Sequence, residues 1–341
     1  MKKILTILIL ISINLYSLTN NEENFLQASE TGNINKVKEL LALGVDVNIQ
    51  DDYYGLTALM YASYKGYTEI VRELIKAGAD VNIKDEEDGT ALIYASFEGY
   101  TEVVRELIKV GADVNIQEEE GFTALICAAK NGNTEIVKEL IKSGANLNIK
   151  DVYGYTALIY ASYGDYTEIV RELIKNGADI NIQNKYGDTA LMWASTYGHT
   201  EIVKELINNG VDVNIQDKEG KTALICVLIW YNREISIELI KAGADVNIQD
   251  CEGYTALIFA SEDGHTEIVR ELIKAGANLN IQNEKGDTAL IGASIGGYTQ
   301  IVEELINAGV DINIQNEEGK TALDYAKEDD ESDDIVELLS K

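Results

Sequence analysis

Residue types that carry out chemistry are scarce in this chain of 341 residues. It contains two histidines, His199 and His265, and three cysteines, Cys127, Cys226 and Cys251. A hydrolytic triad or a zinc site needs nucleophile, base or ligand residues at defined spacings, and these residues do not have such spacings. We therefore expect no catalytic residue, no metal site and no cofactor.

Two segments carry weaker signals for ligands. Gly292–Gly297 is rich in glycine but lacks the lysine of a phosphate-binding loop. The acidic segment Glu118–Glu120 offers carboxylates to calcium, but the ligand spacing of a calcium-binding loop is missing. We interpret the first segment as packing of small residues, and neither segment predicts a cofactor or a metal.

The tripeptide Thr-Ala-Leu recurs nine times along the chain at intervals of 33 residues. The copies begin at Thr57, Thr90, Thr123, Thr156, Thr189, Thr222, Thr255, Thr288 and Thr321. A fixed period of this length indicates one small unit that is copied and stacked, because a single unit cannot bury its apolar face alone. Function is then expected on the surface of the stack.

Each copy contains the signals for two helices. Thr57 is expected to cap a short helix, which Gly66 ends in the left-handed conformation. Thr68 is expected to cap a second helix, which has apolar residues at helical spacing and ends at Gly78. Between copies, an acidic residue and a glycine indicate a projecting hairpin.

The segments Gly55–Leu59, Gly66–Val71 and Gly78–Asn82 carry the pattern of the ankyrin-repeat family, which the chain resembles over nearly all of residues 22–341. The resemblance implies an all-α solenoid of about ten 33-residue repeats, each a helix-turn-helix pair with a projecting β-hairpin loop. The family's proline is alanine here, as at Ala58, and its histidine is isoleucine or methionine, as at Met60. Neither departure is expected to disturb the fold.

The first 17 residues have the order of a secretory signal peptide. Lys2 and Lys3 precede an apolar run that is too short to span a bilayer. We expect cleavage near Ser17 and a location in the periplasm or outside the cell, and an uncleaved N-terminal anchor is the alternative. Residues 18–51 are expected to form a degenerate N-terminal capping repeat.

The remaining chain is expected to hold regular repeats and a second cap. Residues 52–320 are predicted to form eight regular ankyrin repeats, and residues 321–341 a C-terminal capping repeat. An irregular copy near 222–243 keeps its length but carries Trp230, Tyr231 and Arg233 where the other copies have different residues. This repeat either has a binding role of its own, or it has diverged in sequence and its two helices are joined by a different turn.

The formal net charge is −30, and the chain contains no proline. This charge excludes nucleic acid and anionic membrane surfaces as partners, because both require lysine and arginine. It fits a basic protein partner, or it simply keeps a monomeric stack soluble.

Aromatic residues concentrate at the turn tips and on the short helices, interleaved with acidic residues. Tyrosine and tryptophan are over-represented at protein interfaces. The candidate protein-binding residues are Tyr53, Tyr54, Tyr64, Phe97, Phe122, Tyr153, Tyr155, Tyr163, Tyr186, Tyr197, Trp230 and Tyr254. In the ankyrin family these positions line the concave groove. The alternative is that many of these rings only cover neighbouring copies.

We expect a non-enzymatic protein–protein interaction module, exported and binding a protein partner through its groove. Three roles fit: scaffold, inhibitor or protector of a periplasmic enzyme, and secreted effector that engages host proteins. A filament-forming spacer and an enzyme accessory are the competing classes. The identity of the partner stays open.

Overall fold

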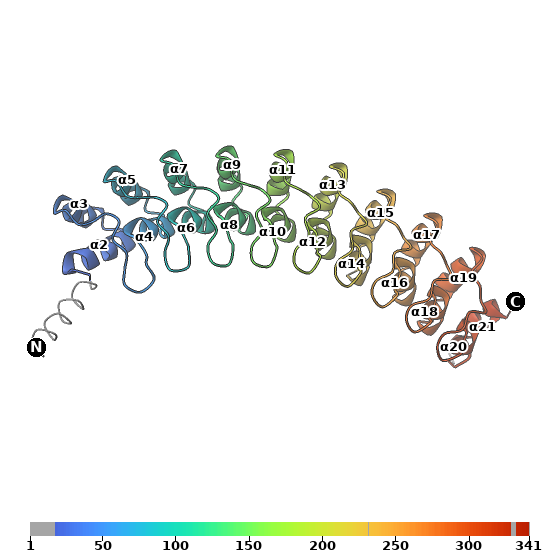
Figure 1. The fold of residues 1–341 in the computed structure, drawn as a ribbon. Helices are drawn as coiled ribbons and strands as arrows, with labels where there is room; N and C mark the ends of the chain where they lie inside the picture. The colour runs from blue at the N-terminus through green and yellow to red at the C-terminus, as the bar shows by residue number, and fades with distance from the viewer. Residues whose placement is uncertain (1–17, 231, 329–331, 341) are drawn as a thin grey trace, which may run out of the picture. The chain divides into compact units, whose positions relative to one another are not determined.

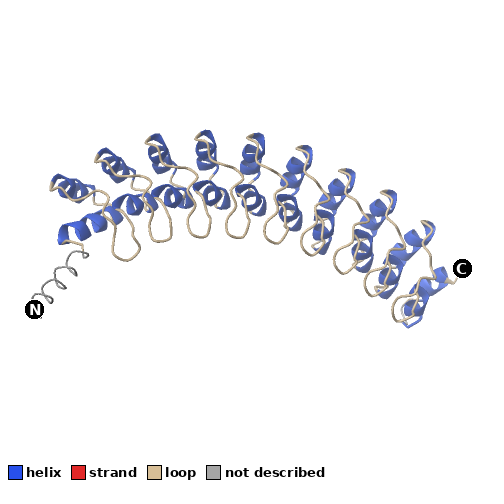
Figure 2. Ribbon diagram, viewed as in Figure 1, coloured by secondary structure: helices blue, strands red, loops and turns tan. Residues whose placement is uncertain are grey.

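The computed structural model describes residues 18–230, 232–328 and 332–340. These residues contain 20 helices and no β strand, as expected for an all-α repeat protein. The predicted signal peptide, residues 1–17, lies outside the described part, as does Tyr231 of the irregular copy. The helices come in successive pairs along the chain (Figures 1 and 2), and from α4 to α19 the first helix of each pair is the shorter one.

The chain divides into two compact units, the first of which comprises residues 1–164 and 175–178. Its first row of helices consists of α2 (Asn20–Glu30), α4 (Ala58–Tyr64), α6 (Ala91–Glu98), α8 (Ala124–Lys130) and α10 (Ala157–Tyr163). Its second row consists of α3 (Ile34–Ala42), α5 (Thr68–Lys76), α7 (Thr101–Lys109) and α9 (Thr134–Lys142). Successive helices of each row pack side by side (Figure 1).

The second unit comprises residues 165–174 and 179–341 and repeats this arrangement. One row consists of α12 (Ala190–Thr196), α14 (Ala223–Ile229), α16 (Ala256–Glu262), α18 (Ala289–Ile295) and α20 (Ala322–Glu328). The other consists of α11 (Thr167–Lys175, whose last residue belongs to the first unit), α13 (Thr200–Asn208), α15 (Arg233–Lys241), α17 (Thr266–Lys274), α19 (Thr299–Asn307) and α21 (Asp333–Leu339).

The Thr-Ala-Leu tripeptide starts each short helix, as predicted. The Thr57 hydroxyl accepts a hydrogen bond from Met60 N at 3.2 Å, which satisfies a backbone donor of the first turn. Ala62 in the same helix is fully buried, and so are its counterparts in the other regular copies. The small side chain at this position lets neighbouring short helices approach closely.

The start of the longer helices differs from the prediction. Thr68 is the first helical residue, and Tyr67 occupies the N-cap position without a side-chain capping bond. The Tyr67 ring instead lies against Gly32 of the preceding repeat, where an added Cβ would be 2.8 Å from the ring. Tyr67 thus packs between copies, and the threonine cap predicted for this helix is wrong.

The projecting loops are tight turns, so the predicted hairpins contain no paired strands within the described residues. In one such loop Asp151 N donates to Tyr155 O at 3.0 Å and Gly154 N donates to Asp151 O at 2.9 Å. These two hydrogen bonds close the turn but do not continue into the ladder of bonds that defines paired β strands. Neighbouring tips are joined by one further bond, as from Val152 N to Glu120 O at 2.8 Å.

Ion pairs on the longer helices connect neighbouring repeats. Arg72 Nε lies 2.8 Å from Glu106 in the next repeat. The same pairing joins Arg105 with Glu139 at 3.2 Å. Exposed pairs of this kind add little stability, so the apolar rows of the two helices hold the stack together.

Candidate functional site

Three positions in each repeat place side chains on the face formed by the loop tips and short helices. They are the residue before the threonine of the Thr-Ala-Leu tripeptide, and the fourth and seventh residues of the short helix. In the α10 repeat these residues are Tyr155, Tyr160 and Tyr163. The aromatic candidates from the sequence fall on the first and third positions or near them, and the middle position was missed.

The missed tyrosines anchor the loops. Tyr160 Oη donates to the Asp151 carboxylate at 2.7 Å, and Tyr61 Oη donates to Asp51 at 2.9 Å. The same aspartates accept backbone N–H groups of their own turns, as Asp151 does from Tyr153 N at 2.9 Å. Burial, together with the hydrogen bond to Asp151, raises the pKa of the Tyr160 hydroxyl far above its usual range. An Asp paired with a Tyr nine or ten residues later was the sequence signal for this contact.

Most of the predicted aromatic residues are exposed. Tyr53 retains 82% of its accessible surface and Trp230 retains 70%. The exposed set is Tyr53, Tyr54, Tyr64, Phe97, Tyr153, Tyr163, Tyr186, Tyr197 and Trp230. These rings provide the exposed aromatic area that a binding face requires.

Three predicted residues are half-buried against neighbouring rings. The ring centroid of Tyr155 lies 5.2 Å from that of Tyr160, and that of Phe122 lies 5.8 Å from it. Tyr254 packs in the same way on Phe259 at 4.8 Å. These three side chains therefore cover neighbouring rings, which is the alternative interpretation given for the aromatic residues. Each keeps part of its surface exposed and can still contact a partner.

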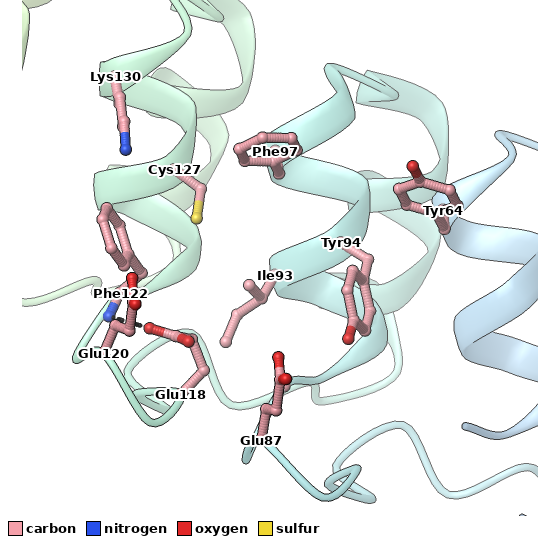
Figure 3. Close-up of a pocket in the computed structure, with 11 residues that line it drawn as sticks. Tyr64, Glu87, Ile93, Tyr94, Phe97, Glu118, Glu120, Phe122, Cys127 and Lys130 are labelled. Atoms are coloured by element: carbon pink, nitrogen blue, oxygen red, sulfur yellow. Dashed lines mark hydrogen bonds between the residues drawn. The ribbon is translucent and has the colours of Figure 1, made fainter. Parts of the chain in front are cut away.

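The first unit has an apolar pocket of about 310 Å³ over α6, which we call the α6–α8 pocket. Tyr64, Phe97 and Phe122 line it together with Ile93, Cys127 and Lys130 (Figure 3). It therefore brings together three of the predicted aromatic residues from three successive repeats. Tyr153 and Tyr163 lie elsewhere on the same unit.

Two small residues open this pocket. Gly89 stands at the position before the threonine, where the next two repeats have Phe122 and Tyr155. Cys127 stands at the middle helical position, where the neighbouring repeats have Tyr94 and Tyr160. Each replaces a ring with a small group, so a hollow remains between aromatic walls.

The pocket is electronegative along its lower edge. Glu87, Glu118 and Glu120 line it, and Glu118 also accepts a hydrogen bond from Phe122 N at 2.8 Å (Figure 3). Burial, the hydrogen bond to Asp85 and the charges of Glu87 and Glu118 raise the pKa of the Tyr94 hydroxyl. Glu87, Glu118 and Glu120 thus lie along one side of the pocket (Figure 3).

Lysine residues already rest on the aromatic rings of this face. Lys130 Nζ lies 4.6 Å from the Phe122 ring centroid and 5.2 Å from that of Tyr160. Lys65 Nζ lies 4.9 Å from the ring centroid of Tyr64. Cations are attracted to ring faces at such distances, so these rings are suited to cationic groups.

A second pocket, of about 360 Å³, lies beside α14 in the second unit. It combines two predicted residues, Tyr186 and Trp230, with Cys226, Asp217 and Lys221. Cys226 again occupies the middle helical position, where a tyrosine would fill the hollow. The irregular copy is therefore also a place where aromatic and charged groups meet.

Among the three cysteines, Cys127 is buried, Cys226 is half-buried and Cys251 is exposed. Burial raises the pKa of the Cys127 thiol to about 12, which disfavours the nucleophilic thiolate. His199 Nδ1 lies 3.5 Å from an Asp165 carboxylate oxygen, and burial lowers the pKa of His265. No group of metal-ligating side chains is found among the described residues, and no described helix is long and apolar enough to cross a membrane.

Paired helices that stack in rows and carry tight projecting loops define a helical repeat protein built to present a surface. The chain belongs to the ankyrin-repeat family. The family model of three ankyrin repeats matches six overlapping segments: residues 25–118, 92–184, 164–250, 191–283, 231–316 and 257–341. Ankyrin repeats are protein–protein interaction modules. No curated protein sequence matches the chain.

Proposed function

We propose that the chain binds a protein partner through the face formed by its loop tips and short helices, without catalysing a reaction. The single observation that carries this proposal is the α6–α8 pocket, where exposed aromatic rings from successive repeats surround an apolar hollow edged by carboxylates. The partner presents apolar and basic groups, because these complement the rings and the acidic edge. The binding groups lie on rigid helices and hydrogen-bonded turns, so little ordering is needed on binding.

We further propose that the protein acts outside the cytoplasm. The support is the order of the N-terminal sequence, with Lys2 and Lys3 before an apolar run and polar residues by Asn14. Residues 18–51 and 321–341 then act as the capping repeats of the mature protein. Fractionation of cells that express the full chain tests the location, and intact Met1 on protein in the cytosol would contradict it.

Affinity capture from the organism's own extract, read by mass spectrometry, tests the binding surface. The wild type is compared with a Tyr64→Ser/Phe97→Ser variant and with a Tyr53→Ser/Tyr54→Ser variant. Val110→Ser is the matched control, because Val110 is 45% exposed, close to the 47% of Phe97, but follows the last turn of α7. Loss of the same partner from one or both aromatic variants supports the proposal. An unchanged partner set with folded variants contradicts it.

A further inference from the structure

Two neighbouring hollows lie side by side in the first unit. The α6–α8 pocket lies over α6, and a second hollow of about 330 Å³, the α4 pocket, lies over α4. Leu56, Met60 and Tyr61 line the α4 pocket, and Tyr64 and Tyr94 border both hollows. The ring centroids of Tyr64 and Tyr94 are 6.0 Å apart with the rings edge to face, so this pair forms the wall between them.

The two pockets differ in charge. The α4 pocket is lined mainly by apolar and aromatic groups, with Lys65 and Glu30 at its rim. The α6–α8 pocket has three acidic side chains, at Glu87, Glu118 and Glu120, against the single cation of Lys130. An apolar side chain fits the first pocket, and a long side chain with an apolar stem and a cationic head fits the second.

The distance between the pockets sets the spacing of the side chains that fill them. The pockets are displaced by one helix-to-helix step, which is about 8–10 Å for packed helices. A polypeptide in the polyproline-II conformation advances about 3.1 Å per residue with three residues per turn. Residues three apart then lie on the same side of the segment, about 9 Å from each other, which matches this step. A partner segment in a helical conformation would place residues three apart only about 4.5 Å along its axis and would not span it.

We propose that the first unit binds a segment of a partner protein in the polyproline-II conformation, in which an arginine or lysine and a large apolar residue stand three positions apart. The basic side chain enters the α6–α8 pocket, with its stem against Ile93 and Phe97 and its charge near Glu87 and Glu118. The apolar side chain enters the α4 pocket over Met60. This inference rests on the proposed function and specifies the chemistry of the bound segment.

The test begins with selection of random twelve-residue peptides displayed on phage against the full chain. The expected result is enrichment of peptides with a basic and an apolar residue three positions apart. Enrichment of acidic peptides, or of basic peptides without this spacing, overturns the inference. Recovery of no binding peptide also overturns it, while a folded partner bound through the wider aromatic face would still satisfy the proposed function.

Synthetic peptides then measure the contributions of the pocket. Fluorescence anisotropy is used to compare peptides whose arginine and leucine are two, three or four positions apart, and the three-residue spacing is expected to bind tightest. Phe97→Ser is expected to weaken binding about 10-fold or more, as for a central interface residue. Glu87→Gln and Glu118→Gln are each expected to weaken it about 2- to 5-fold. Glutamine at position 118 keeps an oxygen that can accept from Phe122 N, so the loop is retained.

Two further variants distinguish recognition of charge at this pocket from a nonspecific response to the net charge of the protein. Lys130→Met removes the cation nearest the proposed site and is expected to tighten binding of the arginine peptide. Glu69→Gln is the matched control, because Glu69 is an exposed carboxylate on the longer helix α5. Equal weakening by Glu69→Gln and Glu87→Gln would show that the peptide responds to net charge and not to this pocket. Weaker binding by Lys130→Met would contradict placement of the basic side chain beside Lys130.

Discussion

Tyr160 Oη donates a hydrogen bond to the Asp151 carboxylate at 2.7 Å, and this contact ties a short helix to the loop that precedes it. Tyr160→Phe removes the hydroxyl and leaves the buried carboxylate with one donor fewer. We expect the free energy of unfolding to fall by about 1 kcal/mol, the usual contribution of such a bond. Urea denaturation followed by circular dichroism measures it. Tyr153→Phe, at the exposed tip of the same loop, is the control and is expected to change nothing.

The glycines that follow the two helices of one repeat differ in what surrounds them. Gly66 has a φ of +74° and faces the Tyr100 ring, which would lie 2.6 Å from an added Cβ. Gly78 has a φ of +92° and no atom within 4 Å of an added Cβ. Gly78→Ala is therefore expected to cost about 1 kcal/mol for the left-handed backbone alone, and Gly66→Ala more, because the ring must move. Equal losses in urea denaturation would contradict the inter-repeat packing of Tyr100.

The Glu262 carboxyl makes the stability of the second unit depend on pH. Its Cγ lies against Gly292, where an added Cβ would be only 2.5 Å away. Burial and the charges of Asp287 and Asp263 raise its pKa from 4.5 to about 7. The folded state then binds more protons than the unfolded state between these values, so stability falls as pH rises from about 4.5 to about 7 and levels off above.

Glu262→Gln is expected to flatten this part of the pH profile and to raise the thermal midpoint above pH 7. The amide is close in shape to the carboxyl and cannot ionise. Thermal unfolding between pH 4 and 8 is the measurement, with Glu69→Gln as the control. A profile that falls equally in wild type and Glu262→Gln would show that other groups cause the dependence.

The sequence predicted the fold well because each repeat is built from local signals. The threonine cap at Thr57, the left-handed Gly66 and the buried Ala62 all act within a few residues of their position. Contacts between repeats were harder to predict. Arg72 pairs with Glu106 and not with Glu69, because the pairing depends on how one repeat is rotated against the next.

The candidate site was predicted in part, because the aromatic residues also recur at local positions of each repeat. The aromatic positions follow from the repeat, and nine of the twelve candidates are exposed. The α6–α8 pocket could not be predicted by aromatic content, because it arises where Gly89 and Cys127 lack a ring. Such a hollow becomes visible only when repeats are aligned and the absent side chains are compared across neighbours.

The irregular copy has a changed N-cap at the start of α15, and two substitutions test whether this cap contributes to stability. Asn232 Oδ1 accepts from Ile235 N at 3.1 Å, a side-chain capping bond that Asn33 also makes at the start of α3 and that Tyr67 does not make. Asn232→Ala is expected to lower the free energy of unfolding by about 1 kcal/mol. Trp230→Ala, at a largely exposed residue, is expected to change it by less than about 0.5 kcal/mol. A large loss from Trp230→Ala would show that its ring is part of the packing and not of a free surface.

The central claim is that the aromatic face of the first unit binds the partner. The most direct measurement is the dissociation constant of the captured partner, purified, for wild type, Tyr64→Ser/Phe97→Ser and Val110→Ser, by isothermal titration calorimetry. We predict at least about 10-fold weaker binding for the double variant and an unchanged constant for Val110→Ser. Equal constants for all three folded proteins would contradict the account.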